Sequence, residues 1–219
     1  MLIACWSVKG GSGTTVVSVA LAATLARSHP RGALVVDLDG DVPAVLGLPE
    51  PDGPGVGEWA AAGESVPVDA LRRLELDAGA GLRVLPAGSA SLATDHVAGR
   101  GEVLAGLLAA DGRPVVVDCG RDPAGVALAV AAAATSSLLV LRPCYLSLRR
   151  AMRAPLRPSG AVLVVEAGRA LGSSDVEAVL GVPVRAQVAV DPAVARAVDA
   201  GLMAGRLPRS LARSVARAA

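Results

Sequence analysis

Short apolar runs alternate with longer stretches of helical periodicity along this chain of 219 residues. The runs are rich in β-branched residues and are continuous, which is the pattern of parallel strands that are buried on both faces. They predict strands at residues 2–8, 33–38, 82–85, 114–118, 138–141, 161–165 and 183–188.

Helical patterns lie between these runs. They predict helices near residues 14–28, 67–76, 95–110, 123–134, 145–154, 173–180, 192–201 and 209–218. Repeated strand–helix alternation predicts an α/β fold with a doubly wound, mainly parallel sheet flanked by helices. The length suits a single nucleotide-binding domain over residues 1–219, and the Pro- and Gly-rich segment 47–59 predicts a mobile surface loop.

The composition narrows the classes of partner. A net charge of +1 gives no electrostatic reason for the whole protein to bind nucleic acid or membrane. Phenylalanine is absent, and the three aromatic residues offer no platform on which bases could stack. No apolar run reaches 18 residues, and the N-terminus has no signal-peptide pattern. We therefore expect a cytoplasmic protein, with peripheral contact at the inner face of the membrane as an open alternative.

Cysteine usage agrees with that compartment. Cys5, Cys119 and Cys144 are an odd number and form no CxxC pair. This pattern indicates a reducing environment and argues against a zinc site or a disulfide framework.

A glycine-rich loop follows the first predicted strand, in the segment WSVKGGSGTT at residues 6–15. Its three glycines allow backbone N–H groups to converge on an anion at the start of the next helix. Lys9 is the only lysine, whereas the other 20 of the 21 basic residues are arginines. A compact ammonium suits a tight backbone loop better than a broad guanidinium does. The sequence therefore predicts a phosphate-binding loop.

Aspartates stand at the ends of two further predicted strands. Asp37 and Asp39 follow the second strand, and Asp118 follows the fourth. In a doubly wound sheet, ligands collect at the carboxyl ends of the strands. A hydrophobic strand that ends in aspartate opposite a phosphate loop is where phosphoryl-transfer proteins hold magnesium. A single such aspartate is more often a helix cap or part of a solvated turn, but the three clusters together favour a nucleotide site.

The loop and the aspartates resemble the ParA/MinD family of deviant Walker A ATPases, over essentially the whole chain. The family loop has the pattern Lys-Gly-Gly-x-Gly-Lys-Thr/Ser, and Lys9 matches its signature lysine. Asp37 and Asp39 match the family's switch I, and Asp118 matches its Walker B strand. The resemblance implies ATP or ADP with Mg2+ as cofactors, catalytic roles for Lys9 and Asp39, and magnesium contacts from Thr15, Asp39 and Asp118. It implies nucleotide contacts from Lys9, Gly10, Gly11, Ser12, Gly13, Thr14, Thr15, Val16 and Glu166.

Two of these positions depart from the family pattern. Thr14 stands where the P-loop lysine belongs, and this replacement resembles the CpaE/TadZ proteins of Flp (tight-adherence) pilus assembly. The receiver-like domain that those proteins commonly carry has no counterpart in this sequence. Glu166 stands where family members often read adenine with asparagine. An ionised glutamate accepts from the adenine amino group but cannot donate to a ring nitrogen.

The family's signature lysine reaches across a sandwich dimer to the partner's nucleotide. The resemblance therefore implies a homodimer in which Lys9 supplies in trans the charge that Thr14 does not supply in cis. We expect a nucleotide-dependent dimerisation switch with weak or no ATPase activity. Its expected pathway is pilus or secretion-system assembly, with a pilus or secretion ATPase or another assembly protein as partner.

Two alternatives remain open at this point. One is a ParA-type partition ATPase that binds DNA, and the other is a pseudo-ATPase interaction module that has lost its nucleotide. The predicted last helix carries Arg209, Arg213 and Arg217, a basic face that DNA or anionic lipid could contact. An ordinary solvated face explains the same three arginines, and the helix is a weak membrane anchor by composition.

Overall fold

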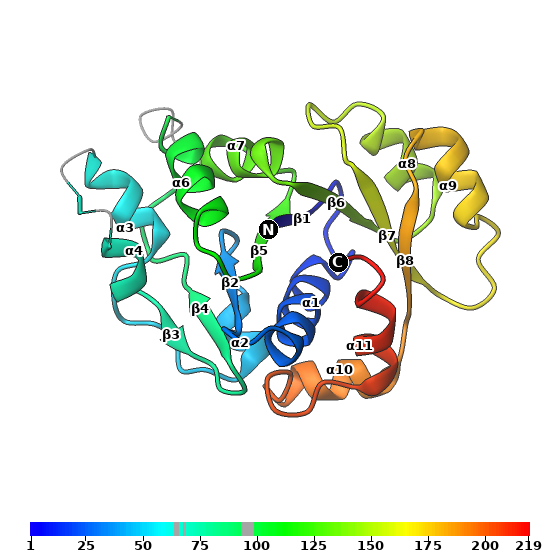
Figure 1. Cartoon of the computed structure of the whole chain (residues 1–219). Helices are drawn as coiled ribbons and strands as arrows, with labels where there is room; N and C mark the ends of the chain where they lie inside the picture. Colours follow the sequence, from blue (N-terminus) through cyan, green and yellow to red (C-terminus); the bar gives the residue numbers. More distant parts are fainter. Residues whose placement is uncertain (64–65, 68, 93–98) are drawn as a thin grey trace.

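The computed structural model describes residues 1–63, 66–67, 69–92 and 99–219 (Figure 1). In these residues, eight strands form one sheet in the order β3-β4-β2-β5-β1-β6-β7-β8. All neighbouring strands pair in parallel except β3 with β4. The strands are β1 (Leu2–Ser7), β2 (Ala33–Asp37), β3 (Leu76–Asp77), β4 (Leu82–Leu85), β5 (Val115–Arg121), β6 (Ser136–Leu141), β7 (Gly160–Val165) and β8 (Val184–Ala189).

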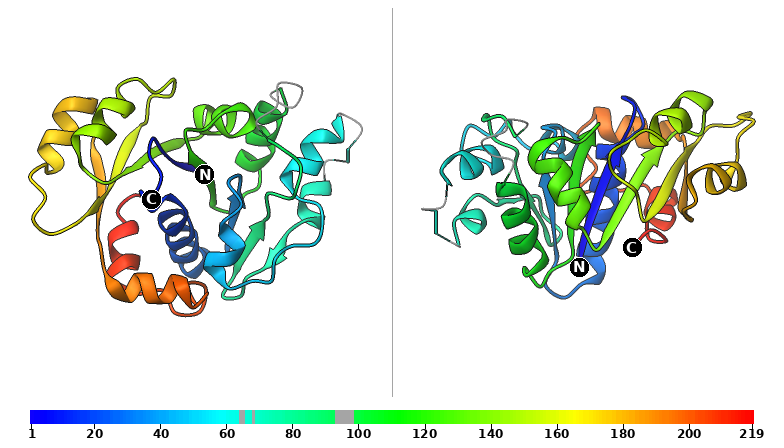
Figure 2. Two further views of the ribbon diagram at one scale, coloured as in Figure 1. Left: turned by 180° about the vertical axis from the view of Figure 1, so that it is seen from behind. Right: turned by 90° about the horizontal axis from the view of Figure 1, so that it is seen from above.

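Helices cover both faces of this sheet (Figures 1 and 2). The described helices are α1 (Thr14–Ser28), α2 (Val42–Leu46), α3 (Val56–Ala61), α4 (Ala70–Arg73), α6 (Arg100–Ala109), α7 (Gly125–Ala133), α8 (Tyr145–Ala151), α9 (Ser173–Leu180), α10 (Pro192–Asp199) and α11 (Arg209–Val215). Helices α1, α2 and α11 pack on one face, and α6, α7 and α8 pack on the other. The predicted doubly wound, mainly parallel α/β sheet is confirmed. No helix among the described residues is both long and apolar enough to cross a bilayer.

The sheet separates two hydrophobic cores, which is why its strands are apolar at nearly every position. All six residues of β1 are buried, with Trp6 facing one core and Ile3 facing the other. The indole Nε1 of Trp6 donates to the hydroxyl of Ser137, 3.0 Å away, so the largest buried side chain has its polar atom satisfied. Strand β1 lies between β5 and β6. The loop that follows β1 therefore emerges at the centre of the sheet's carboxyl edge.

The structure corrects the prediction for segment 47–59. Its second half is packed, because Val56 and Trp59 are buried on α3. The side chain of Glu58 accepts backbone hydrogen bonds from Gly55, 2.8 Å away, and from Ala90, 2.9 Å away. The predicted loop is thus tied to the rest of the chain by α3.

Other differences concern short elements and two predicted helices whose bounds differ in the structure. Strand β3 and helix α2 were not predicted, since two and five residues are too few to show a periodicity. The helix predicted at 67–76 is limited to α4, and residue 68 lies outside the described residues. The start of the helix predicted at 95–110 also lies outside them, and α6 forms the rest.

A close backbone contact joins α2 to the segment after α10. Gly47 ends α2 with a φ of 71°, and a Cβ there would overlap the carbonyl group of Gly201. We expect Gly47→Ala to lower the free energy of unfolding by about 2–4 kcal/mol, through backbone strain and steric overlap. Thermal and urea unfolding measure the effect. Gly53→Ala, which adds a Cβ in open space, is the control. Equal stability of the two variants would contradict the expectation.

Candidate functional site

The loop between β1 and α1 has the geometry of an anion-binding site. Gly11 and Gly13 adopt φ angles of 72° and 87°, a left-handed conformation that strains any residue with a Cβ. Gly13 caps α1 without a side-chain hydrogen bond. The first backbone N–H groups of this 15-residue helix therefore remain available to a bound anion. The hydroxyl of Ser12 donates to the carbonyl of Lys9, 2.6 Å away, and braces the loop from within.

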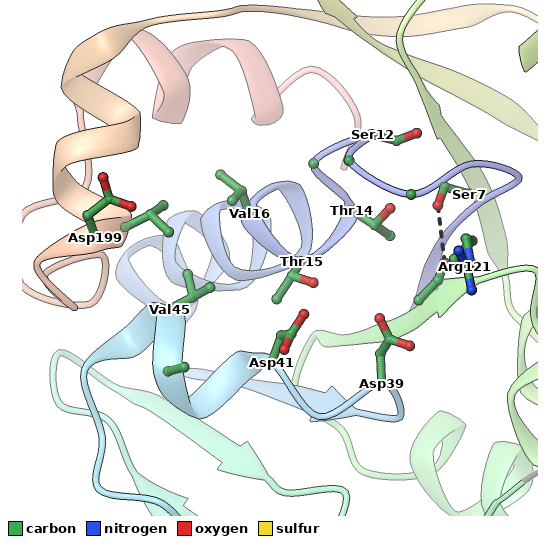
Figure 3. A pocket seen from close by; sticks show the side chains of 16 residues that line it. Ser7, Ser12, Thr14, Thr15, Val16, Asp39, Asp41, Val45, Arg121 and Asp199 are labelled. Carbon is green, nitrogen blue, oxygen red and sulfur yellow. Dashed lines mark hydrogen bonds between the residues drawn. The ribbon is translucent and has the colours of Figure 1, made fainter.

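A pocket of about 700 Å³ opens against this loop (Figure 3). Segments far apart in the sequence form its walls: the ends of β1 and β5, the turn after β2, and parts of α1, α2 and α10. The lining residues are Ser7, Gly10, Gly11, Ser12, Gly13, Thr14, Thr15, Val16, Asp39, Asp41, Ala44, Val45, Gly120, Arg121, Val198 and Asp199.

The structure brings most of the predicted nucleotide-binding residues to this pocket. Residues 10–16 and Asp39 line it. Thr14 and Ser12 are buried, whereas Thr15 is half-buried where α1 begins. Asp118 is completely buried and does not line the pocket itself.

Lys9 and Glu166 lie outside the pocket lining. Lys9 is half-buried, and its charge lies within electrostatic reach of Cys144 at the start of α8. The pKa of the Cys144 thiol is lowered mainly by a hydrogen bond with Ser147 and in smaller part by the charge of Lys9. Glu166 follows β7 and pairs with Arg169 at 2.7 Å, and this pairing lowers the pKa of Glu166. The structure therefore gives Glu166 a local partner on the surface.

Asp37 and Asp118 lie side by side, because β2 and β5 pair in register at these two residues. Both side chains are fully buried. The pKa of Asp118 is raised to about 7, mainly by burial and in smaller part by the charges of Asp37 and Asp39, while the Thr15 hydroxyl acts in the opposite direction. This end of the sheet thus holds more negative charge than the protein satisfies on its own.

The side chain of Asp37 is hydrogen-bonded to the backbone of the turn that follows it. Its carboxylate accepts N–H bonds from Asp39 at 3.1 Å, Gly40 at 2.7 Å and Val42 at 3.1 Å. Burial raises the pKa of Asp37, and these backbone bonds oppose that rise. The three bonds hold the turn between β2 and α2 and so present Asp39 to the pocket. Asp37 therefore positions Asp39.

Asp118 keeps one oxygen without a protein partner. Its Oδ1 accepts from the N–H of Gly120 at 3.3 Å. Its Oδ2 is buried and has no partner of hydrogen-bond geometry among the described residues, although the Thr15 hydroxyl is close enough to lower its pKa. An unpaired buried carboxylate oxygen is costly unless a proton or a cation satisfies it.

The oxygen atoms of Thr15, Asp39 and Asp118 would suit a magnesium ion that also binds a phosphate group. Magnesium prefers oxygen ligands and commonly uses one or two carboxylates together with phosphate oxygens and water. In the part of the chain that the structure describes, no three His, Cys, Asp or Glu side chains form a metal site by themselves. Thr15, Asp39 and Asp118 would supply oxygens next to the glycine-rich loop, and phosphate oxygens would complete the coordination.

Three further charged residues lie at the pocket, and two of them, Asp199 and Arg121, were not singled out from the sequence. Asp41, Asp199 and Arg121 line it. Burial raises the pKa of Asp39, Asp41 raises it further, and the charge of Arg121 lowers it. Arg121 is the last residue of β5, which extends three residues beyond the predicted strand end at 118, so the sequence did not show that Arg121 would lie at the pocket. The sequence carried no signal for Asp199, at the end of α10, either.

Comparison with protein-family models finds no match for this chain. None of the curated proteins is similar to it in sequence. Solved structures, in contrast, are similar in fold.

A ParA family ATPase from Chlorobium tepidum TLS superposes with a TM-score of 0.75 at 19% identity, covering 97% of this chain and 95% of that chain. The septum site-determining protein MinD from Pyrococcus horikoshii OT3, complexed with Mg-ADP, superposes with a TM-score of 0.75 at 19% identity, covering 99% of this chain and 93% of that chain. The cell division ATPase MinD of Pyrococcus furiosus superposes with a TM-score of 0.74 at 24% identity, covering 100% of this chain and 99% of that chain. The chain therefore has the fold of the ParA and MinD P-loop NTPases.

Proposed function

We propose that this protein is a nucleotide-dependent switch of the ParA/MinD family that binds ATP or ADP with Mg2+ in the pocket beside α1. The observation that carries the proposal is the convergence of three features: a helix N-terminus without a side-chain cap, left-handed loop glycines, and an Asp118 Oδ2 with no hydrogen-bond partner among the described residues. The backbone N–H groups of the loop hold the phosphates. Thr15, Asp39 and Asp118 hold the magnesium ion, which neutralises phosphate charge when bound.

The switch is proposed to work through a homodimer. Lys9 lies outside the pocket of its own chain, at the outer edge of the loop, and its charge is felt at the start of α8. This position suits a contact with the nucleotide of a second copy. Thr14 supplies no charge to the phosphates, and such a loss costs about 2–4 kcal/mol of transition-state stabilisation. Hydrolysis is therefore proposed to be weak or absent.

The proposed pathway is pilus or secretion-system assembly, as the CpaE/TadZ-like replacement at Thr14 suggests. The proposed partner is a pilus or secretion ATPase, or another assembly protein. Adenine recognition by Glu166 is part of the same proposal. Displacement of bound ATP by GTP, compared between the natural protein and Glu166→Gln, tests the choice of base.

The C-terminal helix gives a membrane-anchor role no support. Its apolar residues Leu211 and Val215 are buried in the core that contains α1. They are thus unavailable for insertion into lipid. Arg209 and Arg213 remain exposed on α11, and retention on nonspecific DNA at low salt tests the alternative of a partition ATPase.

ATP with Mg2+ is expected to stabilise the protein and to shift it from monomer to dimer. Ligand at about 100 times its Kd adds roughly 2.7 kcal/mol to the free energy of unfolding, which corresponds to a rise in Tm of about 5–10 °C. Thermal unfolding and sedimentation, each with and without Mg2+ and ATP, measure the two effects. ATP with a chelator is the control. An unchanged Tm together with an unchanged monomer would overturn the proposed function in favour of a pseudo-ATPase.

A further inference from the structure

The pocket carries more negative than positive charge. Asp39, Asp41 and Asp199 line it, and Arg121 is the only basic residue among the described residues of its lining. Thr14 stands at the position where the family loop carries a lysine. A polyphosphate entering such a pocket meets like charge unless cations offset it. Magnesium offsets part of this charge, and Arg121 is the cation that the chain itself places there.

The backbone of β5 delivers Arg121 to the loop. Arg121 is the last residue of β5 and pairs with Ser7, the last residue of β1, beyond an irregularity that shifts the register of the two strands after Cys5. The turn at Gly120, with a φ of 63°, directs the chain toward the pocket, and its carbonyl accepts from the hydroxyl of Ser7 at 3.5 Å. Figure 3 shows the Arg121 side chain beside Ser7 and the glycine loop.

The guanidinium group of Arg121 lies alongside the glycine-rich loop, at the edge of the pocket. Its Nη1 is 3.7 Å from the position that a Cβ on Gly10 would occupy, so the group lies alongside the loop. Its charge also lowers the pKa of Asp39, which places it within electrostatic reach of the proposed magnesium site. Arg121 is thus next to both the phosphate loop and the metal-binding carboxylates.

The group is also available for a ligand. Among the described residues, its ion pair is a long one, from Nε to the carboxylate of Asp122 at 3.8 Å, and both side chains are more than 60% exposed. A surface pair of this length contributes little. The two terminal nitrogens can therefore turn to a phosphate, for which the planar guanidinium offers paired donors.

We propose that Arg121 contacts the nucleotide phosphates of its own chain and replaces, from the end of β5, the loop lysine that Thr14 has displaced. The inference rests on the proposed function, since it assumes that the pocket binds a nucleotide. It assigns different tasks to the two cations. Arg121 acts in cis and supports binding by the monomer, whereas Lys9 acts in trans and supports the dimer.

A double-mutant experiment tests this replacement. Calorimetric titration with Mg2+ and ATP is carried out on the natural protein, Arg121→Ala, Arg121→Lys, Thr14→Lys and the combination of Arg121→Ala with Thr14→Lys. Arg121→Ala is expected to weaken binding by about 10- to 100-fold, because a charged hydrogen-bond partner is lost. Arg121→Lys is expected to keep part of the affinity. In the Arg121→Ala background, Thr14→Lys is expected to restore at least half of the lost affinity on a logarithmic scale.

Arg157→Ala is the matched control, because it removes one exposed arginine that lies outside the pocket lining. It is expected to bind as the natural protein does, and the ligand-free Tm of each variant reports on folding. Unchanged binding by Arg121→Ala, or a loss that Thr14→Lys does not restore, overturns the inference and leaves the proposed function standing. A natural protein that binds no nucleotide overturns both.

Discussion

Asp118→Asn is expected to make the ligand-free protein more stable above pH 7 and, at the same time, to abolish its stabilisation by Mg2+ and ATP. Asp118 is fully buried beside Asp37, and its Oδ2 has no partner among the described residues. Burial of the ionised side chain therefore lowers the free energy of unfolding, and a neutral amide does not have this effect. Asparagine keeps an oxygen for the N–H of Gly120 but is a poor ligand for magnesium.

The pH dependence follows from the direction of the pKa shift. Burial raises the pKa of Asp118 to about 7 in the folded protein, whereas an unfolded aspartate titrates near 3.9. Between these two values the folded state binds more protons, so the free energy of unfolding falls as the pH rises from about 4 to about 7. This loss of stability is essentially complete about one pH unit above the folded pKa. Asp118→Asn should remove the loss, so that between pH 5 and pH 8 its free energy of unfolding rises relative to that of the natural protein by roughly 3 kcal/mol.

Urea unfolding at pH 5 and pH 8 measures this gain, and thermal shift with Mg2+ and ATP measures the loss of binding. Asp52→Asn, which removes an exposed carboxylate outside the pocket lining, is the control and should change neither quantity. Equal pH profiles for Asp118→Asn and the natural protein would contradict the raised pKa. A retained response to Mg2+ and ATP would instead remove Asp118 from the proposed metal site.

Some parts of this site could be predicted from the sequence and others could not. The loop was predictable because left-handed backbone positions demand glycine, and Gly11 and Gly13 occupy such positions. The buried strands were predictable because both of their faces are covered. Asp37 and Asp118 were visible as polar residues that end such strands. The division of labour between them was not visible, since it depends on the backbone hydrogen bonds of the turn after Asp37.

The rest of the site depends on contacts that only the folded chain makes. Arg121 becomes a pocket residue because β5 continues three residues beyond Asp118 and turns at Gly120. Asp199 reaches the same pocket from α10, which packs near α2. Trp59, in a segment that its prolines and glycines marked as a loop, is held by tertiary packing. Local composition carries little information about such long-range placement.

Lys9→Ala is expected to abolish nucleotide-dependent dimerisation while the fold and monomeric nucleotide binding persist. The loop uses the backbone of Lys9, whose carbonyl accepts from Ser12 at 2.6 Å, and this bond does not require the side chain. The side chain is half-buried and lies outside the pocket lining, so its loss should change the free energy of unfolding by less than about 0.5 kcal/mol. In the proposed dimer, the phosphates of the two copies would then face each other without a lysine from either side. That repulsion opposes association.

Sedimentation with Mg2+ and ATP, combined with calorimetric titration of the same samples, distinguishes the role of Lys9 from that of Arg121. Lys9→Ala should bind nucleotide yet remain a monomer, whereas Arg121→Ala should weaken both nucleotide binding and dimer formation because the pocket of each monomer is affected. Lys9→Arg is the conservative variant, and it should restore the dimer poorly, since the wider guanidinium suits a narrow approach less well than an ammonium does. If Lys9→Ala forms the dimer at the same nucleotide concentration as the natural protein, the charge supplied in trans is not Lys9. In that case Arg121 would be the cation left to offset the phosphates, and dimer formation would follow the occupancy of each monomer's own pocket.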